Sequence, residues 1–235
     1  MAIPSEAMPN PLHLEPDPEE LSARITKALR TVVEGESMQA SADFPDEVNE
    51  RIPLATANAA QALAQVPAGV RLDVHRLLSV AVHAPSAAKR VTWLHRAADA
   101  VVAAYGPHAA CTRGCSHCCH IPVAMSAAEA RVLGKAIGRA PVPSAHHTPI
   151  RVEGYSSPCP FLHDGACSVY AHRPTVCRTH LNLDVDDLLC RLIPGQAVPV
   201  PYLDTRAFAV ASLEIEPSRD AWADIRQWFP SGRGE

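Results

Sequence analysis

The chain has 235 residues, of which 47% are hydrophobic and 20% are charged, a balance that allows an ordinary buried core. The formal net charge of −4, without a basic run, argues against a nucleic-acid surface, because phosphate binding needs clustered lysines and arginines. No apolar stretch reaches the length that spans a bilayer, and the proline- and acid-rich start does not resemble a secretory signal. We therefore expect a cytoplasmic protein that binds neither nucleic acid nor membrane.

The N-terminal part of the chain predicts a proline-rich tail followed by helices. Residues 1–20 contain five prolines and several acidic residues, so we expect a disordered tail that cannot bury enough apolar surface to fold. Within residues 21–106, apolar side chains recur at spacings of three and four, which predicts helices over 21–34, 54–65, 72–82 and 86–105. Ser86 is a suitable N-cap for the last of these helices, and Gly106-Pro107 ends it.

A cysteine-rich stretch follows that helix directly. Residues 111–120 read Cys-Thr-Arg-Gly-Cys-Ser-His-Cys-Cys-His, and three further cysteines occur before residue 180. In a reducing compartment, thiols at such short spacings indicate a metal site, because the thiolate is the form that binds zinc or iron tightly. The even total of eight cysteines leaves a disulfide framework as a minor alternative. The candidate metal ligands are Cys111, Cys115, Cys118, Cys119, Cys159, Cys167 and Cys177.

Between and beyond the cysteines, several local signals predict short elements. Residues 121–125 predict an extended segment, and Ser126 with Glu129 forms a capping-box pattern that opens a helix ending at Gly138. Residues 140–149, with His146 and His147, predict a solvated loop. Asp164-Gly165 predicts a hairpin turn that would bring Cys159 close to Cys167. Near the C-terminus, residues 194–204 predict irregular chain, and two helices are predicted over 205–215 and 218–229, the second with Trp222, Ile225 and Phe229 on one buried face.

These elements together predict a mainly α fold. Helical N- and C-terminal segments would surround a metal-bound cysteine core made of loops and a hairpin. We divide the chain into a tail at 1–20, a helical segment at 21–106, a cysteine-cluster domain at 107–190 and a C-terminal helical segment at 191–235.

The number of thiols exceeds what one tetrahedral zinc needs, which is four. Cys118 and Cys119 are neighbours, and neighbouring side chains diverge in both helices and strands, so the pair cannot easily bind one ion. An iron–sulfur cluster with spare cysteines, or two metals, suits the count better. His117 and His120 are weaker candidates as ligands. Cys190 lies apart from both cysteine blocks beside two leucines, and we expect a buried free thiol that the metal does not need.

The spacing Cys111-x3-Cys115-x2-Cys118 also matches the cluster motif of radical S-adenosylmethionine enzymes. The chain after Cys118 is too short for the α/β barrel that those enzymes need, and His117 stands where they usually have an aromatic residue. We interpret this match as coincidence.

The order of the two cysteine blocks resembles the CxxCxxCC family of zinc- or iron-chelating, YkgJ-like cysteine-cluster proteins. The resemblance covers roughly residues 108–180 and rests on the Cys115-x2-Cys118-Cys119 knuckle and on Cys159-Pro-Phe-Leu…Cys167-x2-Tyr170…Arg173-Pro174-x2-Cys177-Arg178. The spacing Cys111-x3-Cys115 has one residue more than the family's usual CxxC. The resemblance implies an iron–sulfur or zinc site. A relative with protein lysine N-methylase activity carries a similar cluster, but nothing here matches a methyl-donor site.

Two arginines flank Cys177, the last cysteine of the second block. A site with four thiolates is negatively charged, and we expect Arg173 and Arg178 to contact the bound cofactor, offset its charge and tune its potential. The leading hypothesis is a metal-binding protein whose iron–sulfur cluster or Zn²⁺ has a structural or redox role. A cluster-dependent enzyme of protein or small-molecule modification and an iron or zinc donor to a partner protein remain alternatives.

Overall fold

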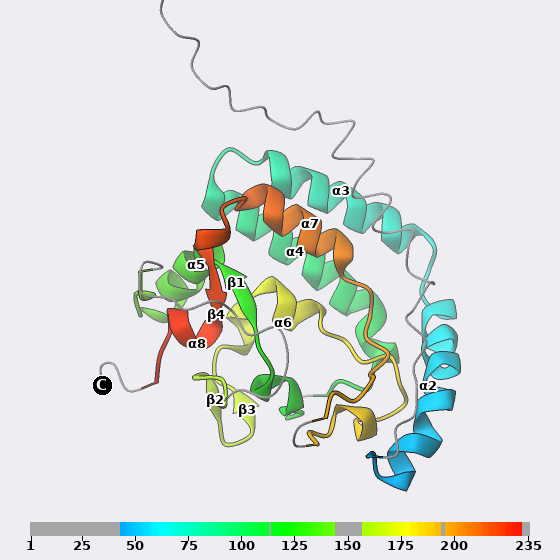
Figure 1. Ribbon diagram of the computed structural model, residues 1–235. Helices are drawn as coiled ribbons and strands as arrows, with labels where there is room; N and C mark the ends of the chain where they lie inside the picture. The colour runs from blue at the N-terminus through cyan, green and yellow to red at the C-terminus, as the bar shows by residue number, and fades with distance from the viewer. Residues whose placement is uncertain (1–42, 113, 144–156, 194–195, 232–235) are drawn as a thin grey trace, which may run out of the picture.

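The computed structural model describes residues 43–112, 114–143, 157–193 and 196–231. The predicted tail at 1–20, the predicted helix at 21–34 and the two histidines of the 140–149 loop lie outside the described residues. The described chain is mostly helical with two small two-stranded sheets, as the predicted fold class requires (Figure 1). Among the described residues, no helix combines the length and apolar character needed to cross a membrane.

Three helices form the N-terminal part, namely α2 (Asp46–Ala64), α3 (Gly69–His83) and α4 (Ala87–Tyr105). Helix α2 begins well before residue 54, where the sequence predicted it. Acidic residues in its first turn suit the positive end of the helix dipole, and the helix continues through Pro53. The start of α4 is as predicted, because the Ser86 hydroxyl accepts a hydrogen bond from Lys89 N at 3.4 Å.

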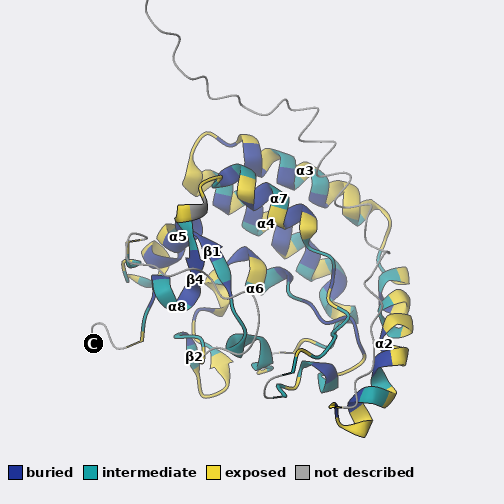
Figure 2. Ribbon diagram, viewed as in Figure 1, coloured by how far each residue is buried: buried dark blue, intermediate teal, exposed yellow. Residues whose placement is uncertain are grey.

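The larger core lies among α3, α4 and α7 (Arg206–Ile215), which contact one another pairwise. Buried and exposed side chains alternate along all three helices, as amphipathic helices require (Figure 2). Alanines such as Ala98 and Ala211 are fully buried between the helices and allow them to pack closely. Leu181 and Leu183, which follow the last cysteine of the second block, are part of this core, so the cysteine region packs directly on the helices.

A second core joins the cysteine region to the C-terminus. Strand β1 (Ala124–Ser126) pairs antiparallel with β4 (Trp222–Asp224), and the short helix α8 (Ile225–Trp228) follows. The predicted helix over 218–229 is therefore wrong. The helical spacing of its apolar residues is overridden by pairing with β1, and the Asp224 carboxylate accepts hydrogen bonds from Val123 N and Arg226 N at 2.8 Å each. Ile225 and Phe229 are nevertheless buried as expected.

Helix α5 (Ala127–Ile137) has the predicted ends but not the complete capping box. The Ser126 hydroxyl accepts from Glu129 N at 3.2 Å, and Gly138 ends the helix with a φ of 69°. The Glu129 carboxylate turns inward instead of toward the Ser126 amide. Its Oε1 accepts from the Thr175 amide and hydroxyl at 2.7 Å each and lies 3.2 Å from His95 Nε2. One buried carboxylate thus joins α5, α4 and α6 (Thr175–Thr179).

The predicted hairpin is confirmed, with β2 (Leu162–His163) paired to β3 (Ala166–Cys167). Asp164 and Gly165 both have positive φ, 48° and 73°, which is the type I′ turn that an Asp-Gly pair favours. Phe161 anchors the hairpin to the second core, where its ring centroid lies 5.3 Å from that of Phe229.

Short 3₁₀ helices occur in the remaining described segments: η1 (Gly106–His108), η2 (His117–His120), η4 (Tyr170–His172), η5 (Leu188–Cys190) and η6 (Arg219–Ala221). A third apolar cluster packs α2 against η5, with Val48, Ile52 and Leu189 buried between them. The part of the C-terminal region predicted to be irregular has no regular element in its described residues, but an isolated bridge pairs Tyr202 with Asn182.

Candidate metal centre

One cavity of about 170 Å³ receives side chains from both cysteine blocks. The segment that leaves α4 forms one wall, and the hairpin and α6 form the others. All seven cysteines proposed from the sequence line this cavity, together with both proposed arginines. The lining cysteines are Cys111, Cys115, Cys118, Cys119, Cys159, Cys167 and Cys177.

Four of these thiols form an inner group, which we define as Cys119, Cys159, Cys167 and Cys177. Every pair of the four interacts electrostatically, so they are mutual neighbours although they come from three separate segments. A backbone hydrogen bond of 2.8 Å from Cys159 N to Cys119 O joins the two sequence blocks directly. The inner group is therefore where the two blocks meet.

Backbone amides are arranged to stabilise thiolates at three positions. Cys115, Cys159 and Cys167 each accept a hydrogen bond from the amide two residues later, donated by His117, Phe161 and Val169 respectively. Such a bond favours the charged form of the sulfur. It opposes burial, which raises the pKa of each of these thiols and takes that of Cys159 to about 11. These amide hydrogen bonds favour metal binding, because a thiol must lose its proton to become a metal ligand.

Cys119 differs from the other inner thiols because its pKa is lowered. The Cys118 thiol is hydrogen-bonded to it, and this bond, with the positive charges of Arg226 and Arg173, outweighs burial and lowers the pKa of Cys119 to about 7. The same bond and burial raise the pKa of Cys118. Burial also raises the pKa of Cys177. Cys119 therefore ionises at a lower pH than Cys118 and the other three inner thiols.

Arg173 faces the thiols more directly than Arg178 does. The guanidinium of Arg173 lies 3.8 Å from the Tyr170 ring centroid, and its buried Nε has no hydrogen-bond partner within the part of the chain that the structure describes. Its charge lowers the pKa of three inner thiols, against burial. Arg178 also lines the cavity, but it donates to Asp99 Oδ1 at 2.6 Å and to the carbonyls of Ala171 and Arg173 at 2.7 Å each. These bonds tie Arg178 to α4 and to the backbone just before α6.

Arg226 is a second cation at the inner group, and the sequence analysis did not find it. Its Nη2 donates to Cys119 O at 2.8 Å, and its charge favours the thiolate forms of Cys119 and Cys159. Arg226 lies in α8, far along the chain from Cys177, the last cysteine of the inner group. It reaches the site only because β4 pairs with β1, and no local sequence signal points to that pairing.

His180 is another lining residue that the sequence analysis missed. Its ring centroid lies 3.9 Å from that of Tyr202, and its buried Nε2 has no hydrogen-bond partner among the described residues. Burial lowers the pKa of His180 to about 4, so the ring is neutral at pH 7. A neutral imidazole is the form that binds metals. His120, which the sequence offered as a candidate, does not line the cavity.

An outer group, which we define as Cys115, His117 and Asp187, lies at the edge of this region. Their three ligand atoms all lie within 4.8 Å of one another, and His117 Nε2 is 3.1 Å from Asp187 Oδ2. All three residues are partly exposed. The sequence analysis considered His117 but not Asp187, although the acidic run before Cys190 was a signal that could have raised it.

Cys190 remains a free thiol but is not isolated. Its Sγ accepts a hydrogen bond from Asn182 Nδ2 at 3.3 Å, while Asn182 N donates to Cys111 Sγ at 3.3 Å. Burial, with the nearby Cys111 and Cys115 thiols, raises the pKa of Cys190 to about 12. It does not line the cavity. That Cys190 is unnecessary for the metal stays a prediction.

Comparison with known proteins identifies the cysteine region. Residues 110–191 match the family model CxxCxxCC, described as "Putative zinc- or iron-chelating domain". The match begins just before Cys111 and ends just after Cys190, so it includes all eight cysteines. It confirms the resemblance that the two cysteine blocks indicated. No curated protein and no solved structure matches the chain.

Proposed function

We propose that the CxxCxxCC domain carried by this chain holds a thiolate-bound metal centre, and that the inner group supplies its principal ligands. The observation that carries this proposal is the convergence of Cys119, Cys159, Cys167 and Cys177 in one cavity. Four thiols are the donor set of both structural zinc sites and iron–sulfur clusters. The donors present therefore fit the metals that the family description names.

The spacing of the thiols favours an iron–sulfur cluster over a single zinc. Zinc–sulfur bonds of about 2.3 Å place the sulfurs of a tetrahedral site roughly 3.8 Å apart. Among the described residues, no three cysteine sulfurs all lie within 4.8 Å of one another, although the four inner thiols are mutual neighbours. A cavity of about 170 Å³ between them has room for a cluster. Sulfurs that lie farther apart than around one zinc ion suit a cluster of several iron and sulfide ions.

The charges around the inner group suit a negatively charged centre. Four thiolates give a cluster net negative charge, and Arg173 and Arg226 place two guanidinium groups beside the sulfurs. Buried cations and amide hydrogen bonds of this kind raise the potential of a cluster. These contacts support a redox role as well as a structural one.

The position of the centre supports a structural role. Its ligands come from η2, the hairpin region and α6, which are all short elements. A bound metal would tie these three elements together and contribute its binding free energy to the fold of the domain. The cavity lining consists mainly of cysteines and aliphatic side chains, with few polar groups besides the arginines and His180. That lining supports the structural or redox role over catalysis.

Elemental analysis and visible absorption of anaerobically purified protein test the proposal. We expect iron and sulfide with broad visible absorption, and we expect Cys119→Ser and Cys177→Ser each to lower the metal content severely. Cys190→Ser is the matched control and should retain the metal. Colourless protein with stoichiometric zinc would rule out the cluster but keep the thiolate centre. Unchanged metal content in both inner variants would contradict the proposal itself.

A further inference from the structure

We infer that the outer group, Cys115, His117 and Asp187, is a second and exchangeable binding position for a divalent metal ion such as Zn²⁺. Its sulfur, nitrogen and oxygen atoms already lie within 4.8 Å of one another. Three protein ligands with an open fourth position are the arrangement of zinc sites that exchange or activate a fourth ligand. This position goes beyond the inner metal centre and needs none of its four principal ligands.

The backbone holds two of these ligands in one turn. Cys115 N donates to Thr112 O at 3.1 Å, and the Cys115 sulfur accepts a hydrogen bond from the amide of His117. His117 begins the 3₁₀ helix η2, so its ring leaves the chain directly beside that sulfur. Because both ligands belong to one short turn, their relative position costs little entropy to maintain when a metal binds.

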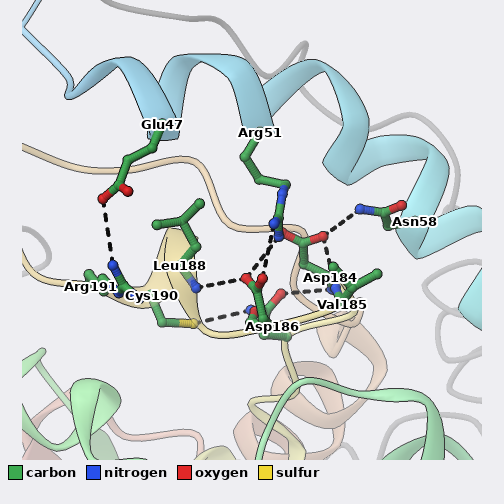
Figure 3. Close-up of polar contacts among 10 residues, drawn as sticks. Glu47, Arg51, Asn58, Asp184, Val185, Asp186, Leu188, Cys190 and Arg191 are labelled. Carbon is green, nitrogen blue, oxygen red and sulfur yellow. Dashed lines mark hydrogen bonds and ion pairs between the residues drawn. The ribbon is translucent and has the colours of Figure 1, made fainter.

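The third ligand comes from a distant segment that α2 holds in place. Arg51 of α2 donates to Asp186 through two bonds of 2.8 and 2.9 Å, and to Asp184 at 3.2 Å (Figure 3). Asn58, also in α2, donates to Asp184 at 2.6 Å. Farther along, Asp186 Oδ1 accepts from Leu188 N at 3.0 Å. Asp187 lies between these fixed points and directs its carboxylate to His117.

The chemistry of the outer group favours zinc over harder cations. Thiolate and imidazole ligands suit Zn²⁺, whereas Mg²⁺ and Ca²⁺ prefer oxygen ligands alone. The thiolate and the carboxylate together carry two negative charges, which balance one divalent ion. The side chains of His117 and Asp187 are 30% and 45% exposed, so an ion there can exchange with solvent.

The outer group is also separable from the inner one. His117 and Asp187 do not line the cavity. Cys115 does line it and interacts with Cys119, but it is not one of the four inner thiols. A variant of His117 or Asp187 therefore removes a ligand of the outer position without touching the inner group. The two positions can be distinguished in one experiment.

Zinc titration of the purified protein tests the inference, with the tightly held metal left in place and loosely bound metal removed by a weak chelator. We expect calorimetry to show one further equivalent of Zn²⁺, which excess Mg²⁺ and Ca²⁺ do not displace. His117→Ala, which removes a ligand, and Asp187→Asn, which replaces a charged carboxylate by a neutral amide, should each weaken this binding by about 10–100-fold or more. Asp187→His, which supplies an imidazole in place of the weakly binding amide, should bind better than Asp187→Asn. His120→Ala, on the same 3₁₀ helix, is the control and should bind as the parent does.

The content of tightly held metal is measured in the same variants and should not change. Absence of a further zinc equivalent in the parent protein would overturn the inference. Equal affinity in the parent and in both ligand variants would also overturn it, because the ion would then bind elsewhere. Loss of the tightly held metal in His117→Ala and Asp187→Asn would show one shared site and overturn the separation of the two positions. The first two results do not affect the proposal that the inner thiols bind metal, which Cys119→Ser and Cys177→Ser test separately.

Discussion

At the scale of single residues, the inner group contains one thiol whose environment differs from that of its neighbours. Cys119 receives a hydrogen bond from Cys118 and faces the charges of Arg226 and Arg173. Cys159, Cys167 and Cys177 are governed by burial, which raises their pKa. A thiol with a pKa near 7 is largely thiolate at physiological pH, and the thiolate is the nucleophile and the metal ligand.

We predict that Cys119 reacts first when the metal-free protein is alkylated. Mass-spectrometric mapping after short iodoacetamide pulses should show half-maximal reactivity of Cys119 near pH 7, with the other inner thiols reacting only at higher pH. Arg226→Ala should move this midpoint upward, because removing a nearby positive charge disfavours the thiolate. Arg226→Lys keeps the charge and serves as the control. Reactivity of Cys119 no different from that of Cys159 at pH 7 would contradict the prediction.

At the scale of elements, α2 is the helix that orders the segment bearing Asp187. Its ion pair with Asp186 is partly exposed, so that pair positions the chain more than it stabilises the whole protein. The side chain of Asp184, by contrast, is buried. The carboxyl group of Asp186 has its pKa lowered by the hydrogen bonds and charge of Arg51.

We predict that Arg51→Ala weakens zinc binding at the outer position and leaves the tightly held metal unchanged. The variant removes the two-bonded contact to Asp186, so Asp187 must be ordered when the ion binds. Zinc calorimetry and elemental analysis measure the two effects. Arg76→Ala is the control. Arg76 lies in α3, is exposed, and forms a weak ion pair of 3.5 Å with Asp73 of the same helix α3. An equal loss of affinity in both variants would mean that α2 has no positioning role.

Glu129 fixes a segment of the inner group, as Arg51 fixes the segment of Asp187. Its buried carboxylate accepts two hydrogen bonds from Thr175, the first residue of the helix that bears Cys177. Burial raises the pKa of Glu129, but the bonds from His95 and Thr175 together lower it below its ordinary value of 4.5. A carboxyl whose folded pKa is lowered contributes stability above its unfolded pKa and loses it as the pH falls through the folded pKa.

We predict that Glu129→Gln lowers the free energy of unfolding by about 1–3 kcal/mol at pH 7, because buried donors lose a charged acceptor. The difference from the parent should shrink below about pH 4.5, where the unfolded parent also protonates this carboxyl. Urea unfolding at pH 7 and pH 4 measures both values. Glu47→Gln, at a side chain that is 63% exposed, is the control. A difference that does not change with pH would show that the charge of Glu129 is not what matters.

At the scale of the whole molecule, the two halves of the fold depend on different forces. Helices α3, α4 and α7 share a continuous apolar core, whereas residues 111–180 rely on short elements arranged around thiols. The hairpin and α5 do pack on the second core through Phe161 and Leu133. The separate cysteine-cluster domain at 107–190 stays a prediction, and metal removal is a way to examine it.

We predict that strong chelation under reducing conditions makes residues 111–180 accessible to protease while α3 and α4 stay protected. Structural metal sites contribute their binding free energy to folding, on the order of 10 kcal/mol in small zinc modules. Limited proteolysis with and without the chelator, followed by mass-spectrometric mapping, locates the cuts. Restoring metal before protease is added should restore protection. Equal resistance in the two states would mean that the metal does not hold this region together.

The sequence by itself determined the features whose causes are local. Ser86 and Ser126 begin helices because their hydroxyls reach a backbone amide three residues later. Asp164-Gly165 makes a hairpin because those residues tolerate positive φ. The match to a zinc- or iron-chelating family was predictable, because cysteines at such short spacings are typical of metal ligands.

Only the tertiary structure decided which residues complete the site. The contacts of Glu129 with His95 and Thr175, the approach of Arg226 to Cys119 and the contact of Asp187 with His117 join residues that are 34 or more positions apart. Residues Trp222–Asp224 form strand β4 and not the predicted helix because their backbone pairs with β1, which is about a hundred residues away in the sequence. The spacing of residues within a short stretch of sequence does not indicate which distant residues will contact them. Pairing and packing over long separations, rather than local propensity, placed these groups around the thiols.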